Sequence, residues 1–222
     1  MPRLQVRSAT EKELSLLFTH ITDRADRARR TGTARPIVDE LLVLLLVDAG
    51  LRPREICALR LRDVRARHGR TGLRVRGVRG ARMRTIETPE RVDKALARFT
   101  RFHRVGAQPS DPLLLSERGT PLSYMSLYSK IHRIGREAGI ARLNPGALRF
   151  AFLRRLYRRE QDLRYVQEQA GHAHLKTTAK YIRALAVCES CGKPVAAGEE
   201  THIDSGQLLC PDCTGELRKL CP

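Results

Sequence analysis

The sequence lacks long hydrophobic runs. Its longest uninterrupted apolar stretch, residues 41–47, is seven residues long, whereas a helix that crosses a membrane needs about 20. The chain begins Met-Pro-Arg-Leu and does not open with the apolar stretch of a signal peptide. These absences exclude a helical membrane protein and predict a cytoplasmic protein without a membrane partner.

Acidic residues are scarce relative to basic ones. The 222-residue chain has 42 Lys and Arg against 24 Asp and Glu, a formal net charge of +18. Hydrophobic residues still make up 41% of the chain, so it can bury a core and is not a disordered basic tail. Most of the basic residues are Arg, which forks onto phosphate oxygens and guanine edges. We therefore expect a nucleic-acid partner; a general bias toward Arg on a solvated surface is the alternative.

Cysteine is nearly absent from the first 187 residues, where Cys57 stands alone in an apolar helical pattern. The other five cysteines lie in residues 188–222, a segment with six acidic and three basic side chains. Residues 1–187 hold 39 basic and 18 acidic side chains, a net charge of about +21. Since the length fits one ordinary domain plus a small module, we predict a boundary between 187 and 188.

Four of the C-terminal cysteines form two Cys-x2-Cys pairs separated by eighteen residues. They are Cys188, Cys191, Cys210 and Cys213. This spacing predicts a four-cysteine zinc site, in which two tight turns complete a tetrahedron. A module of about 35 residues has too little core to fold without the metal. We therefore expect a structural Zn²⁺ in a zinc-ribbon or treble-clef-like module, with His202 and Cys221 as less favoured ligands and disulfides as the alternative.

Hydrophobic periodicity predicts a mostly α-helical protein with a small antiparallel β-sheet. Helices are expected around residues 14–18, then at 37–47, 53–61, 90–105, 123–138, 145–158, 163–169 and 176–185. Two short strands are expected at 73–76 and 84–88, with Gly77 and Gly80 in the turn between them. A polar, Arg-rich link is expected over residues 23–35.

Four short segments occur in order along the basic part of the chain. They are Ala-Gly-Leu-Arg-Pro-Arg-Glu-Ile at 49–56, Leu-Arg-Phe-Ala at 148–151, Ala-Gly-His at 170–172 and Thr-Thr-Ala-Lys-Tyr at 177–181. The intervening Asp-Pro-Leu at 111–113 and Arg-Gly-Thr-Pro-Leu at 118–122 fit the same pattern. Together the segments resemble the two arginine motifs and the closing motif of the tyrosine recombinases of the phage-integrase type. The resemblance covers about residues 8–185.

The resemblance implies that residues 1–187 form a tyrosine-recombinase-like catalytic domain acting on double-stranded DNA. Arg52 and Arg149 would clamp the non-bridging phosphate oxygens, and Glu55 would support Arg52. His172 would hydrogen-bond the same phosphate, and Tyr181 would attack it to form a 3′-phosphotyrosyl link. The resemblance also implies site-specific recombination or integration, self-association on DNA, a nucleoid-associated location and no metal requirement for catalysis.

Two positions depart from the family pattern. Gly146 stands three residues before Arg149, where the family usually has His. Arg79 stands where the family carries a general-acid Lys, and there is no Lys between Lys12 and Lys94. Arg is a poor proton donor near neutral pH, and general acid–base help contributes about 10²–10⁴ in rate per group. These departures predict slower cleavage.

The chain before the first motif is also short. Only about 50 residues precede Arg52, so we expect the N-terminal half of the DNA clamp, which the resemblance implies, to be missing. Cys188 follows Tyr181 by seven residues, and we expect the zinc module to replace the segment that the family sends to a neighbouring protomer.

Three functions remain open from the sequence. The first is an active recombinase that cleaves through Tyr181. The second is a weakened relative that binds DNA as an accessory or regulatory protein. The third is a zinc adaptor whose acidic tail binds a protein partner. The first requires the side chains of Arg52, Arg149 and His172 and the Tyr181 hydroxyl to converge on one basic cleft large enough for a phosphate.

Overall fold

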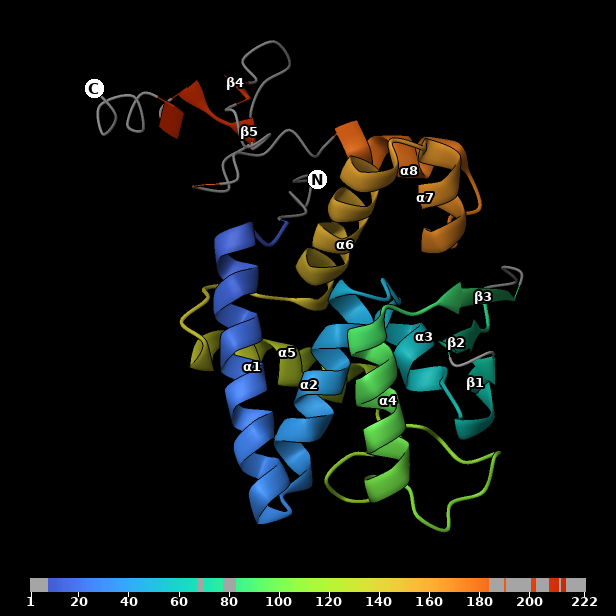
Figure 1. The fold of residues 1–222 in the computed structure, drawn as a ribbon. Helices are drawn as coiled ribbons and strands as arrows, with labels where there is room; N and C mark the ends of the chain where they lie inside the picture. The colour runs from blue at the N-terminus through green and yellow to red at the C-terminus, as the bar shows by residue number, and fades with distance from the viewer. Residues whose placement is uncertain are drawn as a thin grey trace.

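The computed structural model describes residues 8–67, 70–77, 83–183, 190, 201–202, 208–211 and 213–214. Over these residues the chain is mostly helical, with a three-stranded antiparallel sheet and a separate two-stranded hairpin (Figure 1). The predicted fold class, mostly α with a small antiparallel sheet, is confirmed for this part of the chain. No helix within these ranges is both long and apolar enough to span a membrane.

The first helix is longer than the sequence suggested. Helix α1 (Glu11–Thr31) continues through most of the predicted link at 23–35, which is therefore wrong, and ends at Gly32 with φ of 73°. Ala25 and Ala28 continue the buried stripe of this helix, while the charged residues occupy its exposed face. Alanine is only weakly hydrophobic, so the apolar face of this part of the helix is not evident from its mostly polar sequence.

Helix α2 (Ala34–Val47) forms the centre of the fold. Every residue of its apolar run, 41–47, is buried. The helix packs against α1, α4 (Glu90–His103), α5 (Tyr124–Glu137) and α6 (Pro145–Glu160), and Figure 1 shows it between α1 and α4. Because neighbours cover all its sides, the run carries no polar face. The hydrophobic stretch is thus a core helix.

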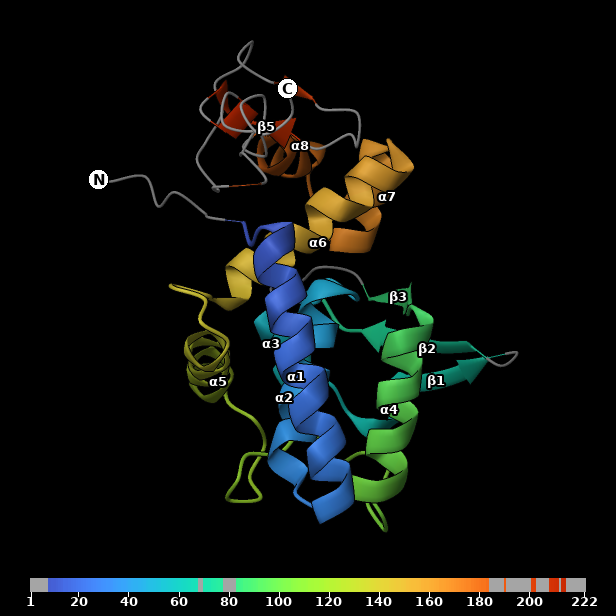
Figure 2. The ribbon, with the colours of Figure 1, turned by 60° about the vertical axis from the view of Figure 1, so that its left-hand side comes forward.

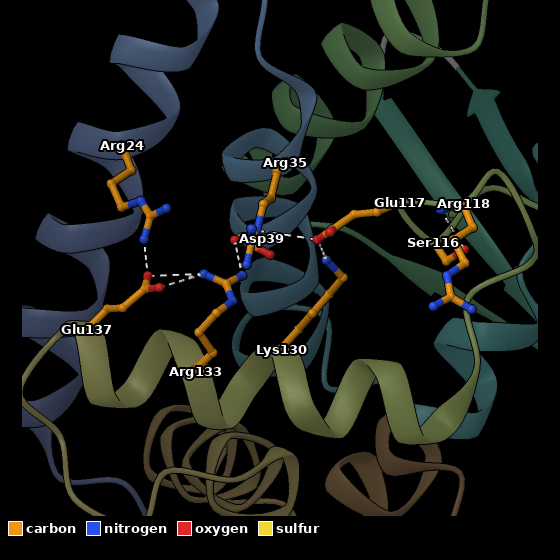
Figure 3. A network of polar contacts seen from close by, with 9 residues as sticks. All are labelled: Arg24, Arg35, Asp39, Ser116, Glu117, Arg118, Lys130, Arg133 and Glu137. Carbon is orange, nitrogen blue, oxygen red and sulfur yellow. Dashed lines mark hydrogen bonds and ion pairs between the residues drawn. The ribbon is translucent and has the colours of Figure 1, made fainter.

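A chain of charged side chains ties α5 to the first two helices. Arg133 of α5 donates to Asp39 of α2 at 2.5 Å and to both oxygens of Glu137 at 2.9 and 3.1 Å. Glu137 also accepts a hydrogen bond from Arg24 of α1 (Figure 3). Asp39 is only 4% exposed, and breaking a buried ion pair is costly because a lone charge is left behind. The network therefore fixes α5, which leads into α6.

The sheet contains one strand that the sequence analysis missed. Strand β1 (Val64–Arg67) pairs antiparallel with β2 (Arg70–Val75), which pairs antiparallel with β3 (Arg84–Glu87). The register places Leu73 of β2 opposite Ile86 of β3, and both side chains are buried. Strand β1 is short and half arginine, so its pairing with β2 rather than its own hydrophobic pattern defines it.

The remaining elements follow α2 and α6 along the chain. Helix α3 (Pro53–Ala58) and the 3₁₀ turn η1 (Leu61–Asp63) follow α2. Helices α7 (Leu163–Ala170) and α8 (Leu175–Arg183) follow α6 and pack against it and against each other. Helix α7 lies on the same side as β3 in both views (Figures 1 and 2). Near the C-terminus, β4 (Thr201–His202) and β5 (Leu208–Leu209) pair antiparallel.

Candidate active site

Arg52 is held at the start of α3. It is the N-cap residue, and Pro53 occupies the first helical position, where its fixed φ suits the helix. The backbone N–H of Arg52 donates to Glu55 at 2.8 Å, and its guanidinium donates to the Gly171 carbonyl at 2.8 Å and to Glu55 at 3.4 Å. The segment 49–56, which contains Arg52, is therefore hydrogen-bonded directly to the segment 170–172, which contains Gly171, as convergence requires.

Glu55 is buried and bridges two arginines. Its carboxylate is 1% exposed and accepts hydrogen bonds from both terminal nitrogens of Arg84 at 2.8 and 3.0 Å. Burial by itself would raise the pKa of Glu55, but the bonds and charge of Arg84, with the Arg52 backbone N–H, lower it overall. Glu55 is thus an ionised carboxylate, as the supporting role predicted for it requires.

Arg84 is a site residue that sequence reasoning missed. It is the first residue of β3, and its side chain is 14% exposed. In the sequence it is distinguished only as part of the strand expected at 84–88. Its one distinguishing signal is its place at the start of a strand that follows the glycine-containing turn, and that signal is weak in a chain with 42 Lys and Arg.

Arg149 reaches the same place from α6. Its guanidinium is 9% exposed and donates to the carbonyls of Gly50 and Ala170, the latter at 2.6 Å. Burial and the neighbouring charge of Arg52 lower the pKa of Arg149 to about 9. The guanidinium remains charged at neutral pH, and burial is the main cause of the shift.

His172 follows the left-handed residue Gly171 (φ 63°) that ends α7. Its Nε2 lies 3.4 Å from Arg149 Nη2, and its Nδ1 lies 3.0 Å from the hydroxyl of the buried Thr178. Because a guanidinium can only donate, Nε2 accepts, which assigns the ring proton to Nδ1. Burial, with the charges of Arg149 and Arg52, lowers the pKa of His172 to about 4. The imidazole is therefore neutral at neutral pH.

Tyr181 of α8 packs beside this histidine. Its ring stacks on the His172 ring with a centroid distance of 5.3 Å, and it contacts the Phe150 ring at 5.4 Å. The tyrosine is half-buried. Since His172 in turn contacts Arg149, the ring of the nucleophile candidate lies with the arginines. The meeting of its hydroxyl with them in a phosphate-sized cleft stays a prediction.

Three arginines and one glutamate set the charge of the site. Arg52, Arg84 and Arg149 contribute three positive charges, and Glu55 contributes one negative charge. These four side chains therefore carry a net charge of +2, and the neutral imidazole of His172 lies beside them. A phosphodiester brings one negative charge and gathers more on its oxygens as it is attacked. The electrostatics suit such a group.

Gly146 lies at the position where the sequence departs from the family pattern. It is exposed in the first turn of α6, one turn before Arg149. Residues three apart on a helix face the same side, so a side chain there would lie beside Arg149. A Cβ at this position would stand 3.0 Å from Asn144 Oδ1, the N-cap acceptor of α6.

Several predicted residues lie outside the described part of the chain. Arg79, Cys188, Cys191 and Cys221 are in this group. Cys210 and Cys213 are described and buried, and His202 belongs to β4. The described residues contain no group of three His, Cys, Asp or Glu side chains placed to hold a metal. The zinc site and the boundary at 187/188 stay predictions.

The sequence is similar to those of known proteins. The sequence matches the model of the phage integrase family over residues 8–186. It is 33% identical to the tyrosine recombinase XerA of Pyrococcus furiosus over 189 residues, which cover 84% of this chain and 60% of that protein. It is 36% identical to the tyrosine recombinase XerC of Chromohalobacter salexigens over 154 residues, 68% of this chain and 50% of that protein.

Solved structures share the fold. A crystal structure of XerA recombinase matches with a TM-score of 0.66 at 24% identity, covering 79% of this chain and 59% of that one. The XerH site-specific recombinase bound to its difH substrate matches with a TM-score of 0.65 at 24% identity, covering 79% and 49%. The chain spans 50% to 60% of the length of the two sequence relatives. Since the family model covers most of its residues, this chain belongs to the phage integrase family.

Proposed function

We propose that this chain carries out site-specific DNA recombination by cutting and rejoining DNA strands through Tyr181. The Tyr181 oxygen attacks the scissile phosphorus and forms a 3′-phosphotyrosyl bond while the bond from phosphorus to the 5′-oxygen breaks. Attack by a 5′-hydroxyl reverses the step and joins a strand. The observation that carries this proposal is the convergence of Arg52, Arg149, His172 and Tyr181 from separate elements.

The arginines are suited to hold the phosphate. A guanidinium has five N–H donors, and the bonds from Arg52 to Gly171 and Glu55 and from Arg149 to Gly50 and Ala170 occupy only some of them. These bonds fix each guanidinium before DNA arrives. The remaining donors are available for the non-bridging oxygens, where such preorganised donors stabilise the transition state.

His172 can change its hydrogen bonding when a phosphate enters. In the free protein Nε2 accepts and Nδ1 donates to Thr178. A phosphate oxygen requires a donor at Nε2, so the ring proton must move to that nitrogen. The Thr178 hydroxyl permits the exchange because a hydroxyl can either accept from Nδ1 or donate to it.

A DNA-binding accessory or regulatory protein is the second candidate. Gly146 favours it, because the residue offers no group to take the tyrosine proton, and Arg79 is a poor proton donor for the leaving oxygen. In this alternative the arginine cluster binds DNA but the chemistry is slow.

Trapping the covalent intermediate separates these two functions. The protein is mixed with nicked suicide DNA from a random-site library, and SDS-resistant protein–DNA adducts are collected. Adducts that disappear in Tyr181→Phe, with DNA affinity unchanged, support the recombinase. If the natural protein yields no adduct while it still binds DNA, the recombinase function is contradicted and the accessory function is supported.

We also propose that the C-terminal segment binds a structural zinc ion through Cys188, Cys191, Cys210 and Cys213. Two of these ligands have a suitable setting. Cys210 and Cys213 are 5% and 8% exposed, and Cys210 directly follows the β4–β5 hairpin. The Cys210 carbonyl accepts from the amide and the hydroxyl of Thr214, at 3.0 Å each. A hairpin followed by a tight Cys-x2-Cys turn suits one half of a four-cysteine site.

Metal analysis tests the zinc proposal. The purified protein should contain one zinc per chain, and Cys210→Ser should lose it while residues 1–187 keep their cooperative unfolding. Cys57→Ser is the matched control, since burial raises the pKa of Cys57 to about 11 and makes it a poor metal ligand. A zinc content that Cys210→Ser leaves unchanged would contradict the proposal.

Double-stranded DNA and a second copy of the chain are the partners we propose, with a further protein partner for the acidic C-terminal segment. If the excess of basic side chains in residues 1–187 binds DNA phosphates, the affinity for DNA must fall steeply as the salt concentration rises, because binding releases counterions. Binding measured between 50 and 200 mM salt tests this, and a flat dependence would contradict it. Deletion of residues 188–222 tests whether that segment supports self-association on DNA.

A further inference from the structure

Arg84 makes a complete fork on a buried carboxylate. Its Nη1 and Nη2 each donate to one oxygen of Glu55, at 2.8 and 3.0 Å. Its Nε is buried and has no hydrogen-bond partner among the described residues. Arg52 contacts the same carboxylate only at 3.4 Å through its guanidinium. Glu55 therefore belongs mainly to Arg84, although Arg52 is closer in sequence.

Gly171 makes room for this arrangement. A Cβ on Gly171 would lie 2.5 Å from Arg84 Nη1, so only a glycine lets the guanidinium pass. The Gly171 carbonyl, meanwhile, accepts from Arg52 at 2.8 Å. Arg52 and Arg84 are thus linked twice, through the carboxylate of Glu55 and through Gly171.

The charges explain what the link achieves. If Arg84 were absent, the carboxylate of Glu55 would be buried with Arg52 as its remaining guanidinium partner. A buried charge is costly unless it is paired, so Arg52 would be drawn onto Glu55. The donors of Arg52 that would otherwise face a phosphate would then be used on the carboxylate.

We propose that Arg84 is a positioning residue of the active site, which saturates Glu55 and so leaves Arg52 free for the scissile phosphate. The inference rests on the proposed function, because it assigns Arg52 to the phosphate. Arg84 does not touch the DNA in this arrangement; it acts through Glu55.

The sheet provides a matched control in Arg74. Arg74 of β2 also lies against a buried carboxylate, with its Nε 3.5 Å from Asp63 Oδ1. Asp63 is 1% exposed, like Glu55, but accepts from the backbone N–H of Arg60 and belongs to η1 rather than to α3. Arg74→Gln therefore reproduces the loss of a strand arginine from a buried carboxylate without disturbing Arg52.

The test compares Arg84→Gln, Arg84→Lys and Arg74→Gln in DNA affinity, single-turnover adduct rate and thermal unfolding. Misplacement of a phosphate-binding group by about 1 Å costs of order 100-fold in rate. Arg84→Gln should therefore slow adduct formation by that order, with a much smaller change in Kd, and Arg84→Lys should recover part of the rate. An adduct rate in Arg84→Gln equal to that of Arg74→Gln would overturn the proposal.

A double-mutant cycle distinguishes positioning from direct contact with DNA. If Arg84 acts through Glu55, Arg84→Gln combined with Glu55→Gln should be no slower than the slower single variant. Rate losses that multiply would show that Arg84 acts on the phosphate by itself and would overturn the positioning role.

A measurement without DNA keeps the inference separate from the proposed function. The pKa of the Glu55 carboxyl, followed by carbon NMR, should rise in Arg84→Gln and stay unchanged in Arg74→Gln. If the natural protein forms no adduct, the proposed function fails, and this pKa alone decides whether Arg84 saturates Glu55. An unchanged Glu55 pKa in Arg84→Gln would overturn the inference.

Discussion

The rings of His172 and Tyr181 stack at 5.3 Å with an interplanar angle of 26°. The tyrosine ring is therefore held against the histidine, and the histidine is held by Thr178 on one side and Arg149 on the other. The nucleophile candidate is thus placed by contacts within the protein before DNA is present.

Thr178→Val should slow adduct formation and lower stability. The hydroxyl is the partner of His172 Nδ1 in a buried place, and an unpaired buried donor costs about 1–3 kcal/mol. Thr178→Ser should restore both properties because it keeps the hydroxyl. Thr100→Val removes a hydroxyl that donates to the Leu96 carbonyl in α4 and serves as the control. Urea unfolding and adduct kinetics measure the effects; equal adduct rates in Thr178→Val and Thr100→Val would contradict the prediction.

Stability should fall as the pH falls from about 6.5 toward about 4. His172 has an ordinary pKa of 6.5, which the fold lowers to about 4. Between these two pH values the His172 side chain binds a proton in the unfolded chain but not in the folded protein, so lowering the pH favours unfolding. Above pH 6.5 the side chain is neutral in both states, and its contribution to the free energy of unfolding is fully present. His172→Gln should make the free energy of unfolding depend less on pH over this range.

The difference between the natural protein and His172→Gln isolates this group. His20 also has a pKa lowered by burial and by the charge of Arg24, and it acts in the same direction in both proteins. Free energies of unfolding at pH 7 and pH 5 are the measurement. Identical losses in the two proteins would show that His172 does not titrate as described.

Gly171→Ala should impair the site more than an equivalent change elsewhere. Both Gly171 and Gly139 have positive φ, 63° and 73°, and an L side chain in that region costs about 1–2 kcal/mol. At Gly139 a Cβ meets nothing within 4 Å, whereas at Gly171 it meets the Arg84 guanidinium at 2.5 Å. Gly139→Ala should therefore lower Tm alone, and Gly171→Ala should lower both Tm and the adduct rate. A Gly171→Ala protein with the adduct rate of Gly139→Ala would be inconsistent with this contact.

Gly146→His combined with Arg79→Lys should accelerate cleavage. Each change restores a proton-handling group of the family pattern, and such groups contribute about 10²–10⁴ in rate. Gly146→Ala is the control, because it adds a Cβ beside Asn144 without a titratable group. Adduct rates on suicide DNA are compared; no acceleration in the double variant would mean that other groups already move the protons.

The sequence alone named most residues of the candidate site. Arg52, Arg149, His172 and Tyr181 could be named because each lies in a short motif, and the motifs, in their order along the chain, resemble those of the tyrosine recombinases. Most helices were also predictable, since their apolar residues recur at helical spacing. Local patterns are sufficient wherever the information lies within a few neighbouring residues.

Tertiary structure alone decided the rest. Arg84 lies 29 residues from Glu55 along the chain, and nothing local separates it from the many other arginines; only the placement of β3 beside α3 pairs them. Strand β1 and the second half of α1 likewise depend on what they pack against. The ring proton of His172 is set by Arg149 and Thr178, which folding brings to its two nitrogens. Burial and pairing depend on contacts between segments that are distant in the sequence. These contacts distinguish residues, such as the many arginines, that local sequence patterns cannot tell apart.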